Sequence, residues 1–130
     1  TGSFLVKHLR INWIEGEKYF KDTLLDYDTA NNVSGWQWIA GCGADAAPYF
    51  RIFNPITQSE KFDPEGIFIK KWVPELKALP KKFVHKPWEL PKDLAIEINF
   101  NLKKDYYEPI VDHAEARRAA LSAFEHTKKK

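Results

Sequence analysis

Residues that start or stop helices recur at short intervals along this chain, and they restrict it to short helical segments. Asp28 stands where an N-cap would, because its carboxylate can accept hydrogen bonds from free backbone N–H groups. Gly41-Cys42-Gly43 then predicts the end of that helix. Pro55 predicts another helix start, because proline is favoured at the first position of a helix. Further starts are predicted at Asp63-Pro64 and at Asp112.

The spacing of apolar residues supports the same interpretation. Apolar side chains recur at helical intervals over the ranges 3–13, 15–25, 65–72 and 112–127. In the third of these, Ile67, Phe68 and Trp72 are expected to face inward. The chain is therefore predicted to be mainly α.

The character of the sequence changes over residues 80–107. Three prolines and the lysines between them predict an extended, irregular surface segment. Within it, residues 95–102 alternate apolar and polar side chains as a strand does, but no partner strand is evident. No Pro/Gly/Ser-rich linker divides the chain, so we expect one domain over 1–130.

Composition excludes several classes of protein. The formal net charge of +2 over 130 residues excludes a histone-like basic protein, so any nucleic-acid surface must be local. No apolar run approaches the roughly 20 residues that cross a bilayer. Cys42 is the one cysteine, which excludes an internal disulfide and a Cys-rich zinc site. A cytoplasmic protein without membrane or metal partners is expected.

Two short polar motifs are candidate binding elements. Asp26 and Asp28 form a D-x-D pair that could hold a metal ion, a ribose or a heterocyclic N–H group, but a helix cap and a loop carboxylate explain them equally simply. Asn31 and Asn32 follow. They could be ordinary capping residues, or one amide could offer a donor and an acceptor to a cofactor nitrogen.

The tryptophans form a third candidate group. Trp36 and Trp38 lie two residues apart, about 200° around a helix, so they face different sides. One could belong to the core and the other to a pocket, where an indole can stack on a nucleobase.

Surface lysines are the last candidates. The sequence motifs of metal sites, phosphate loops and nucleophilic sites are absent. Six lysines could contact phosphates or could form an ordinary solvated surface: Lys61, Lys70, Lys71, Lys77, Lys81 and Lys82. The four histidines are too scattered along the sequence to indicate a metal site. No Gly-rich phosphate loop and no Ser/His/Asp arrangement can be assembled.

One run of motifs narrows these alternatives. Residues 26–55 contain, in order, D-x-D, A-N-N, G-W-Q-W and R-I-F-N-P. This run resembles the C-terminal part of the photolyase/cryptochrome family, and looks most like the bacterial cyclobutane pyrimidine dimer photolyases. The resemblance continues through FLVKHL, KFDPEG, KWVPEL, HKPW and PIVDHAEAR, and only residues 89–107 match poorly. It implies the C-terminal portion of an all-helical FAD-binding domain.

The resemblance also implies a cofactor site. The D-x-D loop lies against the flavin in this family, so Asp26, Tyr27 and Asp28 are the expected FAD contacts, with Tyr27 in place of a common glycine. Asn32 falls where the family's asparagine approaches flavin N5, and its amide is expected to stabilise the reduced flavin. A second, antenna chromophore is implied in an N-terminal domain that this sequence does not contain.

The implied function is light-driven repair of cyclobutane pyrimidine dimers in DNA, by electron transfer from reduced FAD, in a monomeric enzyme. Trp36 and Trp13 match the flavin-proximal and middle members of an electron-carrying tryptophan chain. Trp38 matches a tryptophan of the pocket for the flipped dimer, and Gln58 matches a DNA-contacting position.

Departures from the family leave a second function open. The chain matches only the last part of a much longer protein, so we expect a truncated piece whose partial cavity holds FAD weakly and whose apolar faces are exposed. The alternative function is a cryptochrome-like blue-light sensor that uses the same flavin and tryptophans. Trp38 and Gln58 favour the lyase, because a sensor needs no dimer pocket.

Overall fold

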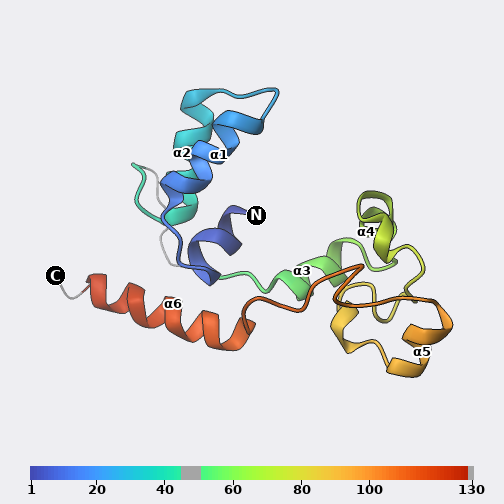
Figure 1. The fold of residues 1–130 in the computed structure, drawn as a ribbon. Helices are drawn as coiled ribbons and strands as arrows, with labels where there is room; N and C mark the ends of the chain where they lie inside the picture. Colours follow the sequence, from blue (N-terminus) through green and yellow to red (C-terminus); the bar gives the residue numbers. More distant parts are fainter. Residues whose placement is uncertain (45–50, 129–130) are drawn as a thin grey trace. The chain divides into compact units, whose positions relative to one another are not determined.

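The computed structural model describes residues 1–44 and 51–128, apart from the side chain of Lys128, and the regular structure of these residues is helical (Figure 1). The expectation of a mainly α fold is confirmed. The chain divides into two compact units, Thr1–Phe53 with Val111–Lys130, and Asn54–Ile110. The single domain expected over 1–130 stays a prediction.

The described residues of the first unit form four helical elements. They are the π-helix η1 (Phe4–His8) and the α-helices α1 (Trp13–Thr23), α2 (Thr29–Ala40) and α6 (His113–Lys128). The predicted caps of α2 and α6 are confirmed. The Asp28 carboxylate accepts from the backbone N–H of Asn31 at 2.8 Å, and that of Asp112 accepts from Glu115 at 2.9 Å. Gly41 ends α2 in the left-handed conformation, with a φ of 74°.

The predicted helix over 3–13 is confirmed over Phe4–His8 but is wrong beyond it, because the chain breaks between η1 and α1. Arg10 adopts a φ of 55°, which no helix accommodates. Asn12 then caps a new helix, and its side chain accepts from the backbone N–H of Ile14 at 3.1 Å. Trp13 therefore occupies the first turn of α1 rather than the end of the preceding helix.

A buried tryptophan joins α1 to α2, which lie side by side in Figure 1. Trp36 is 4% exposed, and its ring meets Phe20 edge to face with centroids 5.2 Å apart. Gly16 of α1 lies directly beneath the indole. A Cβ added to Gly16 would come within 2.2 Å of Trp36 Cη2, so only glycine permits this approach of the two helices.

Two histidines join η1 to α6. His8 is 4% exposed, and its Nε2 lies 2.8 Å from Nδ1 of His113. Burial lowers the pKa of His8 below its ordinary value of 6.5, and the neighbouring His113 lowers this pKa further.

The second unit has its own core. Its elements are α3 (Pro55–Phe62), α4 (Ile67–Trp72), the 3₁₀ turns η2 (Pro74–Leu76) and η3 (Pro87–Glu89), and α5 (Lys92–Glu97). The start of α3 at Pro55 is confirmed, with the Asn54 side chain as its cap. The core consists of the buried side chains Leu76, Leu79, Val84 and Phe100.

The predicted inward face of α4 is wrong. Ile67, Phe68 and Trp72 are 71%, 66% and 64% exposed, whereas Ile69 packs against the core. The helix begins two residues later than predicted because Gly66 precedes it in the left-handed conformation. The three exposed side chains form an apolar face on α4.

The predicted extended segment is also wrong over 92–97, where α5 forms. Pro91 precedes the helix, and Asn99, with a φ of 53°, turns the chain after it. The backbone N–H of Phe100 then bonds to the carbonyl of Ala95 at 2.8 Å, which brings Phe100 into the core. The alternating pattern of 95–102 is therefore shared between a short helix and a turn.

Within the described part of the chain, no helix is both long and apolar enough to cross a membrane.

Replacement of Gly16 by alanine tests the packing of α1 on α2. We expect Gly16→Ala to lower the free energy of unfolding by about 1–3 kcal/mol through overpacking, despite alanine's better helix propensity. Gly35→Ala is the matched control, since no heavy atom lies within 4 Å of its added Cβ, and it should stabilise α2 by up to about 1 kcal/mol. Urea unfolding followed by tryptophan fluorescence measures both. Equal effects of the two substitutions would contradict the proposed close approach.

The contact of the buried His8 with His113 predicts acid sensitivity. Because the folded-state pKa of His8 lies below 6.5, the unfolded chain takes up a proton first, so the free energy of unfolding should fall as pH drops through and below 6.5. His8→Gln should flatten this slope. His126→Gln, at an exposed position of α6, should leave the slope unchanged. Urea unfolding repeated between about pH 7.5 and 5 measures the slopes, and a slope that survives His8→Gln would assign the effect to other groups.

Candidate functional site

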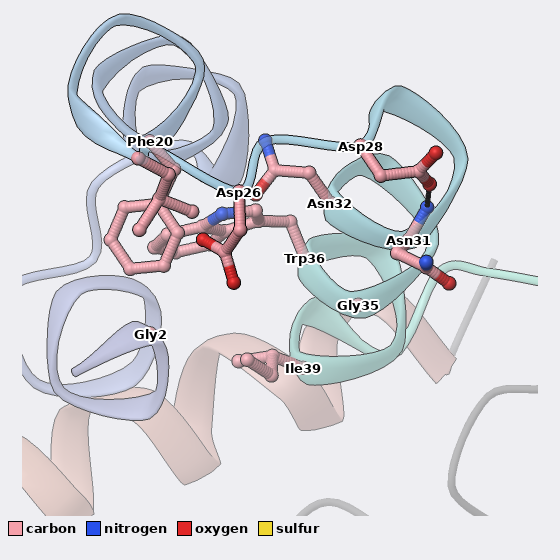
Figure 2. A pocket seen from close by; sticks show the side chains of 10 residues that line it. Gly2, Phe20, Asp26, Asp28, Asn31, Asn32, Gly35, Trp36 and Ile39 are labelled. Atoms are coloured by element: carbon pink, nitrogen blue, oxygen red, sulfur yellow. Dashed lines mark hydrogen bonds between the residues drawn. The ribbon is translucent and has the colours of Figure 1, made fainter.

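A cavity of about 390 Å³ opens beside α2 in the first unit (Figure 2). This volume is at the lower end of the range found for small-molecule sites. The cavity is lined by residues of the N-terminal turn, α1, the α1–α2 loop and α2: Gly2, Phe20, Leu24, Asp26, Asp28, Asn31, Asn32, Gly35, Trp36 and Ile39.

Helical periodicity explains how one short helix supplies so much of this lining. With 3.6 residues per turn, Asn32, Trp36 and Ile39 follow one another along a single face of α2. The cap at Asp28 sets where the helix begins and hence which face these residues share. The lining is polar near the start of α2 and apolar further along (Figure 2).

The two carboxylates of the D-x-D pair have different surroundings. Asp28 caps α2, and Figure 2 shows its bond to Asn31 as a dashed line. Asp26, in the α1–α2 loop, is exposed and makes no hydrogen bond or ion pair with any residue that the structure describes. The cap interpretation is therefore confirmed for Asp28, whereas the Asp26 carboxylate remains available to a ligand donor.

The side-chain amide of Asn32 is held by Glu17 of α1. Asn32 Nδ2 donates to the Glu17 backbone oxygen at 3.1 Å and to its Oε1 at 3.2 Å. Both partners are acceptors, so the nitrogen must face Glu17, and the orientation of the amide is settled. Asn32 Oδ1 is thereby left as an acceptor for another group.

The apolar part of the lining comes from Trp36, Phe20 and Ile39. The indole and phenyl rings meet edge to face, and the indole is almost fully buried. An apolar wall beside a carboxylate and an amide oxygen suits a planar ring that carries N–H donors at its edge. The residues present therefore fit a flavin ring system.

The structure brings together only some of the residues singled out from the sequence. Asp26, Asp28, Asn32 and Trp36 line the cavity. Tyr27 does not line it, but its hydroxyl donates to Glu17 Oε1 at 3.2 Å.

The other predicted residues lie outside the lining. Trp13 is half-buried at the start of α1, and Trp38 is 53% exposed on α2. Gln58 is half-buried on α3 in the second unit. Their predicted roles stay predictions. Among the described residues, no group of three potential metal ligands occurs.

Glu17 is the functional candidate that sequence reasoning missed. No sequence motif includes Glu17, yet it is half-buried and bonded to Tyr27 and Asn32. Its partners lie 10 and 15 residues away, so no local spacing could have indicated the contact.

Comparison with known proteins assigns this chain to a family. Residues 1–126 match the family described as the FAD binding domain of DNA photolyase. The chain is 55% identical over 129 residues to a deoxyribodipyrimidine photo-lyase of Agrobacterium fabrum, covering 99% of this chain and 27% of that protein. It thus spans about a quarter of the length of the curated relatives it matches.

Solved structures agree with this placement. The crystal structure of a bacterial class III photolyase from Agrobacterium tumefaciens is similar at a TM-score of 0.91 and 54% identity, with 99% of this chain and 27% of that chain covered. A cryptochrome from Synechocystis is similar at a TM-score of 0.86 and 38% identity, with 93% and 25% covered.

Substitutions at Asp28 separate its capping role from any role of its charge. Asp28→Ala should lower the free energy of unfolding by about 1 kcal/mol through loss of the cap, whereas Asp28→Asn should preserve the cap and the stability. Asp22→Ala, at an exposed position of α1, controls for removal of a carboxylate. Urea unfolding followed by circular dichroism measures these changes. A loss with Asp28→Asn equal to that with Asp28→Ala would mean that the charge, not the cap, stabilises α2.

Proposed function

This chain belongs to the DNA photolyase family, and from that premise we propose that it supplies one wall of the FAD site in a light-driven lyase that repairs cyclobutane pyrimidine dimers in DNA. The single observation that carries the proposal is the cavity beside α2. It joins an apolar indole wall to a free carboxylate and an oriented amide oxygen.

FAD, when bound and reduced, would supply the electron that opens the cyclobutane ring after light is absorbed. The chain's own residues would bind and orient the ring system. Asp26 would accept a hydrogen bond from an N–H group at the ring edge. Asn32 Oδ1 would accept from the N–H at N5, which the reduced form has and the oxidised form lacks, so Asn32 would favour the reduced form.

The aromatic residues would have two further roles. Trp36 would exclude water from the ring and, with Trp13, carry electrons to the cofactor during its photoreduction. Trp38 would stack on the flipped dimer, which its 53% exposure allows, and Gln58 would contact the DNA backbone. The proposed substrate is thus recognised by stacking, with additional contacts to phosphates.

A second candidate is a blue-light sensor. The specific observation in its favour is the structural similarity to the Synechocystis cryptochrome. In a sensor, the same cavity and tryptophans would serve light-driven reduction without a dimer pocket. Dimer repair separates the two candidates.

The test uses the gene product that carries this chain, purified at its full encoded length. It is incubated with an oligonucleotide that contains cyclobutane thymine dimers, in blue light and in darkness. We expect loss of dimers in the light alone. A parallel oligonucleotide with (6-4) lesions should remain unrepaired. A protein that binds FAD but repairs neither lesion would contradict the lyase and support the sensor.

Trp38→Ala tests the stacking role. Loss of one aromatic platform should weaken binding to dimer-containing DNA by about fivefold to 150-fold, because such stacking contributes about 1–3 kcal/mol. Trp72→Ala, which removes another exposed tryptophan from α4, should leave binding unchanged. Fluorescence anisotropy of labelled oligonucleotides measures the affinity. Equal losses in the two variants would contradict a specific role for Trp38.

A further inference from the structure

Three residues from three consecutive segments meet at one carboxylate oxygen. Glu17 Oε1, on α1, accepts the hydroxyl of Tyr27 from the α1–α2 loop and the amide of Asn32 from α2, each at 3.2 Å. All three side chains are half-buried. Hydrogen bonds to a charged acceptor are stronger than those between neutral groups, so this arrangement holds its donors firmly.

One of the two hydrogen bonds that orient the Asn32 amide depends on the position of the Glu17 carboxylate. Of the two acceptors for Asn32 Nδ2, the backbone oxygen is fixed by helix α1, but Oε1 belongs to a flexible side chain. Within the described structure, the Tyr27 hydroxyl is the only other group recorded as bonded to that oxygen. It therefore restrains the Glu17 rotamer in which Oε1 faces Asn32.

From this geometry we infer that Tyr27 is a positioning residue of the cofactor site, which acts through Glu17 to keep Asn32 Oδ1 directed toward the ligand. The inference rests on the proposed FAD site. Its consequence is a preference for the reduced cofactor, because only the reduced form offers an N–H at N5 to that oxygen. Tyr27 does not line the cavity, so its influence on the cofactor is indirect.

The first experiment needs no cofactor. Selective ¹⁵N-asparagine labelling of the chain gives the side-chain amide signals of Asn32 by NMR, assigned by their loss in Asn32→Ala. Tyr27→Phe keeps the ring and removes the hydroxyl. It should shift both Asn32 amide proton signals and speed their exchange with solvent several-fold. Tyr19→Phe, an exposed tyrosine of α1, is the matched control and should change neither.

The second experiment measures the cofactor equilibrium in the full-length gene product. At the potential where the wild-type protein is half reduced, Tyr27→Phe should lower the ratio of reduced to oxidised flavin about fivefold, the size expected for one hydrogen bond. In a Glu17→Ala background, the same substitution should have no effect, since the carboxylate through which it acts is gone. Tyr19→Phe should leave the ratio unchanged in both backgrounds.

The outcomes separate this inference from the proposed function. A wild-type protein that takes up no flavin would overturn the proposed function and, with it, the cofactor preference assigned to Tyr27. A protein that binds flavin but shows unchanged amide signals and an unchanged ratio in Tyr27→Phe would overturn the inference alone. A fivefold loss that persists in the Glu17→Ala background would also overturn it, because Tyr27 would then act by another route.

Discussion

The contact between Trp36 and Gly16 is the constraint on which the first unit depends. The indole occupies the space that a side chain at position 16 would need, and this brings α1 close to α2. Only at that separation can Glu17, the next residue of α1, reach the amide of Asn32. The cavity wall and the polar network beside it are therefore two results of one packing arrangement. A buried aromatic group supports a site whose polar members lie at its edge.

Features governed by local sequence were predictable. The caps at Asp28 and Asp112 and the helix start at Pro55 depend on a few neighbouring residues, and each is found where the sequence predicts it. The clustering of Asp26, Asp28, Asn32 and Trp36 at one cavity was expected from the family resemblance rather than from spacing, and their roles as ligand contacts stay predictions.

Features that depend on distant contacts were not predictable. The apolar residues of α4 lie on more than one face of a short helix, and a core built from later residues, Leu76 to Phe100, decides which of them is covered. Residues 95–102 alternate like a strand, yet the left-handed Asn99 turns Phe100 inward after a short helix. Glu17 was not singled out from the sequence, because its partners lie 10 and 15 residues further along the chain, in a segment folded back against it.

The Asn32 amide nitrogen donates to two acceptors of Glu17, and this arrangement has a consequence for reactions that move charge in the cavity. A dipole that is already oriented before a ligand arrives does not have to rotate when the charge on that ligand changes. The cost of ordering Asn32 is met during folding, by the same contacts that assemble α1 and α2. The environment on this side of the cavity would therefore contribute little reorganisation energy to an electron transfer.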